Sequence, residues 1–147
     1  MTNNEIAADA EGEDPRVGIV LGYLDAFSRG DIDHMMQLSA DDPLWVVPGR
    51  SYLAGDHRGQ PAVAKLLGEL RARLEPFELR PQDVLVSAKH IAVIHDMTAI
   101  REERSHALAG GFVFDVRDGH VLKVFSFTLD LYALDELLGS GRGAAEE

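Results

Sequence analysis

The sequence predicts an α+β domain in which three N-terminal helices pack on a curved, mostly antiparallel sheet around an internal pocket. Its 147 residues suit one domain with a single core. Apolar side chains recur at helical spacing up to residue 74, and at a period of two from residue 79 onward. Because the helices precede the strands instead of alternating with them, the order is typical of α+β folds.

The three helices are predicted from their capping residues and apolar spacing. Asp14 caps the first helix, which ends at Gly30, and Asp31 caps a short second one over 32–38. Pro61 opens the third helix. The core face of this third helix carries five apolar residues: Val63, Leu66, Leu67, Leu70 and Leu74.

The strands are predicted from β-branched and aromatic segments bounded by turn residues. A first strand lies between Pro43 and Pro48, and the following segment 49–59 is rich in loop residues. Four later segments are predicted as strands: 83–87, 90–101, 111–117 and 120–130. The turn Asp118-Gly119 joins the last two as a hairpin.

Both ends of the chain are predicted to lie outside the folded domain, which spans residues 14–138. Residues 1–13 are acidic and poor in apolar side chains, so we expect a disordered tail. Residues 139–147 are rich in glycine, so we expect a flexible tail. Neither a secretory signal nor an apolar run of about 18 residues is visible, so we expect a cytoplasmic protein without membrane contact.

Composition and spacing argue against several classes of site. The chain has no cysteine and a net charge of −11, which disfavours thiolate chemistry and nucleic-acid binding. None of its six histidines has the spacing of a metalloprotease helix, so no metal is predicted. Gly110-Gly111 precedes a strand and not a helix, so no nucleotide cofactor is predicted either.

Four motifs together resemble the SnoaL-like branch of the nuclear transport factor 2-like superfamily, over roughly residues 14–138. They occupy residues 22–33, 45–49, 53–59 with Ala62-Val63, and 117–121 leading to Asp130. The resemblance implies a cone-shaped domain around a pocket for a small organic molecule. It does not imply one reaction, because this fold carries isomerases, cyclases, hydrolases and binding modules.

The catalytic carboxylates of the best-known members do not carry over to this chain. Tyr23 matches the oxyanion-hole tyrosine of ketosteroid isomerase, a well-known example of pKa tuning. The general base of that enzyme falls on Val47, and its protonated acid falls near Phe112. The Asp-Arg-Asp constellation of limonene epoxide hydrolase falls approximately on three other residues: Met97, Ala99 and Ser126. Catalysis here would therefore need another arrangement.

Strand alternation predicts which side chains face the pocket. If Phe112, Phe114 and Val116 point inward, the inward residues of the strand before them are Val93, His95, Met97 and Ala99. On the last strand they are Val124, Ser126 and Thr128, with Asp130 at the mouth. A slip of one residue would invert every assignment.

Three residues are candidates for catalysis. His95 would be the acid/base, Asp130 would orient it, and Tyr23 would donate a hydrogen bond to the substrate. The alternatives are a hydrogen-bonded core histidine, a solvated carboxylate at a strand end, and a packed tyrosine with a polar tip. The predicted substrate-binding residues are Trp45, Val47, His57, Met97, Phe112, Phe114, Ser126 and Thr128.

The resemblance and these candidates predict a cofactor-independent acid/base enzyme, a cyclase, isomerase or hydratase/hydrolase, acting on a hydrophobic carbonyl-bearing metabolite. One alternative is a non-catalytic module that binds a small apolar ligand. Another is an interaction domain that uses the outer face of the sheet. Phe125 and Phe127 are expected on that face, and they favour a homodimer.

Overall fold

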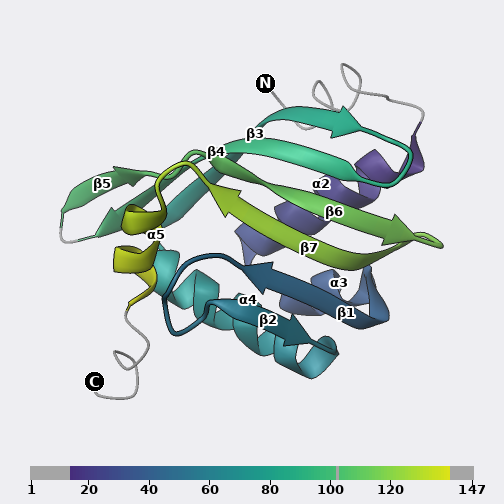
Figure 1. Cartoon of the computed structure of the whole chain (residues 1–147), viewed down its shortest axis with the longest axis horizontal. Helices are drawn as coiled ribbons and strands as arrows, with labels where there is room; N and C mark the ends of the chain where they lie inside the picture. The colour runs from purple at the N-terminus through teal and green to yellow at the C-terminus, as the bar shows by residue number, and fades with distance from the viewer. Residues whose placement is uncertain (1–13, 102, 140–147) are drawn as a thin grey trace.

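The computed structural model describes residues 14–101 and 103–139 (Figure 1). The predicted tail 1–13 and all of the predicted tail 139–147 except Gly139 lie outside the described residues. Its helices are α2 (Pro15–Arg29), α3 (Ile32–Gln37), α4 (Gln60–Leu74) and α5 (Leu131–Leu138). The first three confirm the helices predicted from the sequence. Gly139 was predicted to belong to the flexible tail. In the structure its carbonyl oxygen accepts a hydrogen bond from the Tyr52 N–H at 3.3 Å.

The helix ends form where the capping residues predict them. The Asp14 carboxylate accepts from the Arg16 N–H at 3.0 Å, and the Asp31 carboxylate accepts from the His34 N–H at 3.1 Å. Each bond satisfies one of the amides that a helix start leaves unpaired. Gly30 ends α2 in the left-handed conformation, with φ of 78°, which a residue without Cβ adopts at little cost.

One curved sheet of seven strands makes up most of the remaining described chain. The strands are β1 (Ser39–Val47), β2 (Gly55–Arg58), β3 (Phe77–Val86), β4 (Ile91–Arg101), β5 (Arg104–Ala107), β6 (Gly110–Arg117) and β7 (His120–Thr128). Their order is β2-β1-β7-β6-β4-β3, and β5 pairs with β4. Only the β1–β7 pairing is parallel among the strands described.

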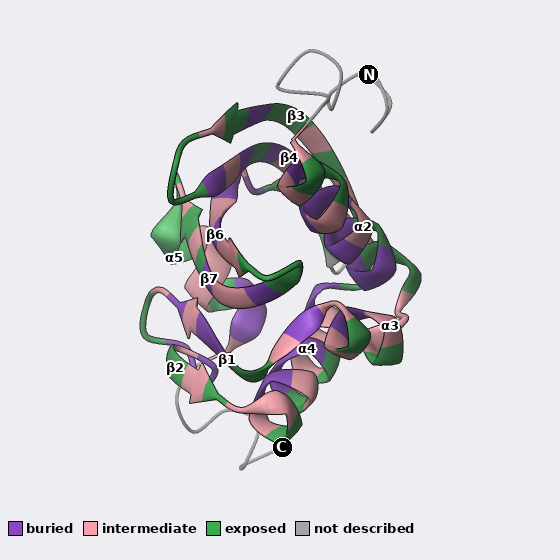
Figure 2. Cartoon of the chain, turned by 90° about the vertical axis from the view of Figure 1, so that its right-hand side faces the viewer, coloured by how far each residue is buried: buried purple, intermediate pink, exposed green. Residues whose placement is uncertain are grey.

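The strands curve around the interior, and α2 and α4 lie on the side that they leave open (Figure 2). This arrangement confirms the predicted α+β cone. The Asp118-Gly119 hairpin is confirmed too, since both residues have positive φ, 51° and 78°, as a type I′ turn requires. In the register of this hairpin Phe112 pairs with Ser126, and both residues line the cavity described below.

Five elements, β2, β3, β5, β7 and α5, differ from the sequence-based expectations. Segment 49–59, predicted as a loop, contains β2, and β5 forms between two predicted strands. Strand β3 begins at Phe77 instead of residue 83 and passes through Pro81, which is tolerated because β3 is an edge strand with a bulge there. The last predicted strand ends at Thr128, and the chain then forms α5 at the end of the sheet where β1 and β7 finish (Figure 1).

Candidate functional site

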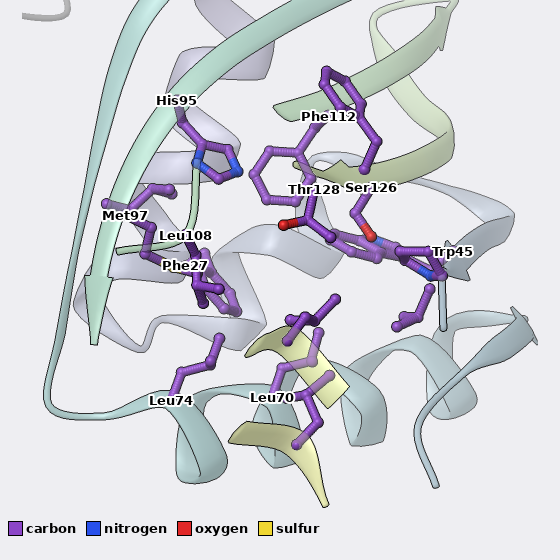
Figure 3. A pocket seen from close by; sticks show the side chains of 16 residues that line it. Phe27, Trp45, Leu70, Leu74, His95, Met97, Leu108, Phe112, Ser126 and Thr128 are labelled. Carbon is purple, nitrogen blue, oxygen red and sulfur yellow. The ribbon is translucent and has the colours of Figure 1, made fainter. Parts of the chain in front are cut away.

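A cavity of about 60 Å³ lies between the concave face of the sheet and the helices α2, α4 and α5 (Figure 3). Its walls are almost entirely apolar. Strands β1, β3, β4, β6 and β7 contribute one side. From the other side, α2 contributes Phe27, and α4 and α5 contribute leucines. The lining residues that carry polar side-chain atoms into this apolar space are His95, Ser126 and Thr128.

An aromatic wall supports His95. The rings of Trp45 and Phe112 meet edge to face, with centroids 5.7 Å apart and planes at 67°. The His95 ring lies against Phe112, with centroids 5.0 Å apart and planes at 37°. Three strands, β1, β6 and β4, therefore place flat side chains around one space.

His95 is buried without a hydrogen bond. It is 6% exposed, and among the described residues neither of its ring nitrogens has a hydrogen-bond partner. Burial lowers the pKa of His95 from 6.5 to about 4, and the nearby Asp96 carboxylate opposes this shift only in part. His95 is therefore a neutral imidazole at pH 7, with free hydrogen-bonding capacity inside an apolar cavity.

The two hydroxyls of the cavity are already engaged with the backbone. Ser126 Oγ donates to the Val46 carbonyl at 3.3 Å, and Thr128 Oγ1 donates to the Ala109 carbonyl at 3.4 Å. Thr128 Oγ1 also accepts from the Asp130 N–H at 3.2 Å. Both hydroxyls therefore form hydrogen bonds with backbone carbonyls near strand ends. Among these three polar side chains of the cavity, His95 is the one without a hydrogen-bond partner among the described residues.

Comparison with protein families places this architecture in a known group. The family model of the SnoaL-like domain matches residues 20–124, which include most of α2, all of β1 and α4, and most of the sheet. The chain belongs to the SnoaL-like domain family. The comparison with curated proteins found no match.

Solved structures support the same fold for this SnoaL-like domain. Bal32a, from a soil-derived mobile gene cassette, is 28% identical with a TM-score of 0.75, covering 94% of this chain and 100% of that one. A nuclear transport factor 2-like protein from Burkholderia xenovorans LB400 is 27% identical with a TM-score of 0.71, covering 85% of this chain and 96% of that one. A protein from Jannaschia sp. CCS1, whose name assigns it to the SnoaL-like polyketide cyclases, is 17% identical. Its TM-score is 0.72, and the match covers 84% of this chain and 91% of that one, which shows the shared fold.

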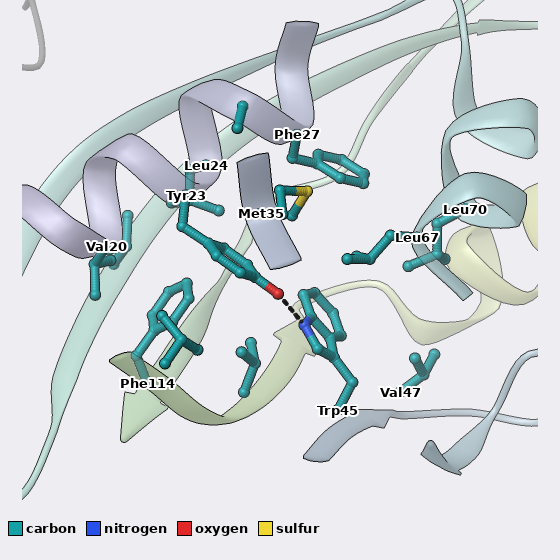
Figure 4. Close-up of a cluster of buried hydrophobic side chains, with 14 of the residues drawn as sticks. Val20, Tyr23, Leu24, Phe27, Met35, Trp45, Val47, Leu67, Leu70 and Phe114 are labelled. Atoms are coloured by element: carbon teal, nitrogen blue, oxygen red, sulfur yellow. Dashed lines mark hydrogen bonds between the residues drawn. The ribbon is translucent and has the colours of Figure 1, made fainter. Parts of the chain in front are cut away.

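Tyr23 lies in the core of the SnoaL-like domain and not in the lining of its cavity (Figure 4). Its hydroxyl oxygen accepts from the Trp45 Nε1–H at 2.7 Å, and burial raises the pKa of the Tyr23 hydroxyl. Its ring packs edge-on against Phe114, with centroids 5.7 Å apart. The structure thus gives Tyr23 the alternative role, that of a packed residue with a polar tip, and makes it the residue that orients Trp45.

Asp130, His57 and Phe114 also lie outside the cavity lining. The Asp130 carboxylate caps α5 by accepting from the Ala133 N–H at 3.0 Å, so it is not placed to orient His95. His57 sits on β2, where Nε2 lies 2.7 Å from the Leu53 carbonyl oxygen. Phe114 is fully buried in the core beneath the cavity wall. The remaining predicted residues do line the cavity: Trp45, Val47, His95, Met97, Phe112, Ser126 and Thr128.

Sequence reasoning missed the helical side of the lining. Leu134 and Leu138 of α5 contact the cavity, together with Leu108 from the chain between β5 and β6. The sequence did carry a signal for α5. Asp130 precedes Leu134 and Leu138, which are four residues apart, and a carboxylate before apolar residues at helical spacing is typical of a helix start.

Two further classes of site are absent from the described part of the chain. No three His, Asp or Glu side chains within it come together as a metal site would require. No helix within it is long and apolar enough to cross a membrane.

Proposed function

We propose that this domain binds a small hydrophobic carbonyl compound in the cavity and promotes cofactor-independent acid/base chemistry on it. Isomerisation, cyclisation and hydration or hydrolysis belong to this class. The observation that carries the proposal is the buried His95 side chain, which faces an apolar space without any hydrogen bond to the described residues. Leaving such a group unpaired destabilises a fold by about 1–3 kcal/mol, and a ligand that completes its hydrogen bonding offsets this loss.

Position and chemistry support His95 as the group that acts on the substrate oxygen. It is the one ionisable side chain in the cavity lining, within the part of the chain that the structure describes. The positions that would carry the isomerase carboxylates by resemblance, Val47 and Phe112, line the same cavity but are apolar. Charge that develops on a substrate oxygen would therefore meet His95 in surroundings of low polarity, where one hydrogen bond has a large effect.

Deuterium exchange into a simple ketone tests the chemistry, whatever the natural substrate is. Acetophenone, a one-ring ketone, exchanges its methyl protons in D₂O when it enolises, and proton NMR follows the loss of signal. We expect the protein to accelerate this exchange and the His95→Phe substitution to reduce the acceleration about a hundredfold, the effect of losing an oxyanion donor.

The control is His90→Gln, which changes an exposed histidine outside the cavity. This variant should accelerate deuterium exchange of the acetophenone methyl group as much as the unmodified protein does. Equal rates with the protein and with buffer would contradict catalysis on this compound class.

Non-catalytic ligand binding is the second candidate function. It is favoured by the placement of Asp130, which caps α5 and leaves His95 without an orienting carboxylate. Acetophenone that raises the melting temperature of the protein without faster exchange would favour this function over catalysis.

We also propose that the outer face of the sheet forms a homodimer interface. The strand register places Leu85, Ala92, Val113 and Phe125 in one row and Ile94, Gly111 and Phe127 in the next. Leu85 is 50% exposed, and Ile94, Phe125 and Phe127 are each 37% exposed. An apolar patch that crosses four strands is typical of an interaction surface.

Light scattering tests the dimer through the mass in solution. We expect twice the chain mass of 16.1 kDa, and the chain mass itself for Ile94→Asp, because the substitution buries a charge in the interface. Unchanged circular dichroism in the variant would show that it folds. A monomer for the unmodified protein at micromolar concentration would contradict the proposal.

A further inference from the structure

The two ring nitrogens of His95 differ in their surroundings. Nδ1 is sealed in the protein interior without a hydrogen-bond partner. Nε2 also has no partner among the described residues, but it is not sealed in this way. The ring points into the cavity toward Phe112 and Thr128 (Figure 3). A ligand in the cavity therefore reaches His95 through Nε2.

The sealed nitrogen determines where the proton resides. A neutral imidazole has one N–H donor and one acceptor nitrogen. A proton on Nδ1 would leave a donor orphaned in the interior, and orphaned buried donors are rarer in proteins than under-satisfied acceptors. The proton consequently belongs on Nε2, where it faces the cavity.

We propose that the Nε2–H of neutral His95 donates a hydrogen bond to the carbonyl oxygen of an uncharged, single-ring ketone. This inference rests on the proposed function and makes it more specific. His95 then acts as a hydrogen-bond donor to the substrate oxygen and not as the base that removes a proton.

Charge and size define the ligand class. No charged side chain lines the cavity within the described residues, so nothing there would compensate an ionic ligand. The cavity of about 60 Å³ is smaller than the roughly 150 Å³ that admits benzene in a comparable apolar site. A single ring therefore already requires flexible side chains such as Met97 to move aside. A fused bicyclic ligand would have to displace Leu134 and Leu138 with α5.

The donor role gives a balanced enolisation step. Hydroxide from solvent removes a proton from the carbon next to the carbonyl and becomes water. The C–H electron pair becomes the C=C bond of the enolate, and the carbonyl π pair moves to oxygen. Nε2 keeps its proton and stabilises the negative oxygen.

Nitrogen NMR of ¹⁵N-histidine-labelled protein at pH 7.5 tests the tautomer directly. We expect the His95 signals of a neutral ring protonated at Nε2, with His95→Phe used to assign them. A ring protonated at Nδ1, or an imidazolium at this pH, would overturn the proposal.

Two ligands with the same carbon skeleton, acetophenone and ethylbenzene, test the hydrogen bond from Nε2–H to the ketone oxygen. Acetophenone should bind about tenfold more tightly than ethylbenzene, because only the ketone accepts from Nε2–H. In His95→Phe this preference should disappear while ethylbenzene still binds, and His90→Gln should retain it. A bicyclic ketone, 2-acetylnaphthalene, should bind about tenfold more weakly than acetophenone.

The outcomes separate this proposal from the proposed function. Equal affinities for acetophenone and ethylbenzene would overturn the hydrogen bond but leave the cavity as a ligand site. Tighter binding of the bicyclic ketone would overturn the size limit. Failure of all three compounds to bind would contradict the proposed function itself.

Discussion

The substitution His95→Phe is expected to remove most of the difference in stability between pH 7.5 and pH 4.5. Burial lowers the pKa of His95 to about 4, from 6.5 for an ordinary histidine, so the unfolded chain binds the proton more readily than the fold does. The stabilisation from keeping His95 neutral is complete above pH 6.5 and is lost as the pH falls toward 4. A shift of this size corresponds to about 3 kcal/mol of unfolding free energy.

Urea unfolding at a series of pH values measures this effect. Asp14 also has a lowered pKa, because of its hydrogen bonds with Arg16, and its contribution to stability is lost at the acidic end of the series. The His95→Phe protein retains Asp14, so the difference between the two proteins isolates His95. At pH 7.5 the variant should be as stable as the unmodified protein or about 1 kcal/mol more stable, since an unpaired buried polar group is gone. Parallel pH profiles for the two proteins would show that His95 is not neutral and desolvated in the fold.

Gly110→Ala is expected to destabilise the domain by about 3 kcal/mol or more, at the upper end of the range for overpacking. A Cβ at this position would overlap the Phe127 carbonyl oxygen and lie 2.9 Å from Thr128 Cα, both part of the backbone of β7. Because Gly110 pairs with Thr128 on one side and His95 on the other, the clash would separate the strands that form the cavity wall. Thermal unfolding monitored by circular dichroism measures the loss.

Gly18→Ala is the matched control for Gly110→Ala. Gly18 lies inside α2, and an added Cβ there meets nothing within 4 Å. Alanine should therefore raise the unfolding free energy by about 0.5–1 kcal/mol, the difference in helix propensity. A Gly110→Ala protein as stable as Gly18→Ala would contradict the close packing of β6 against β7.

The predictable parts of the fold are those encoded by local residues. Asp14 and Gly30 bound α2 because capping depends on neighbouring backbone atoms, and alternation on β4 placed His95 on the buried face. Strand β2 was missed because its pairing partner is β1, and the exposed residues of β2 show no alternation of their own.

Side-chain partners were harder to predict than side-chain direction. Tyr23 was predicted to donate a hydrogen bond to the substrate, yet its contacts depend on Trp45, 22 residues away in sequence, whose indole N–H donates a hydrogen bond to the Tyr23 hydroxyl oxygen. Asp130 was placed near the mouth by extending β7 past Thr128, whereas the chain turns there and uses the carboxylate as a helix cap. Both corrections come from tertiary contacts that a pattern of residue types does not record.

The cavity around neutral His95 is tested most directly by mapping acetophenone binding on ¹⁵N-labelled protein by amide chemical shifts. The proposed function predicts that the largest changes cluster on β4, β6 and β7 around His95, Phe112 and Thr128, with a change at the indole of Trp45, the one tryptophan of the chain. Changes confined to the surface hollow near Arg50 and Tyr132, with none at His95, would contradict it.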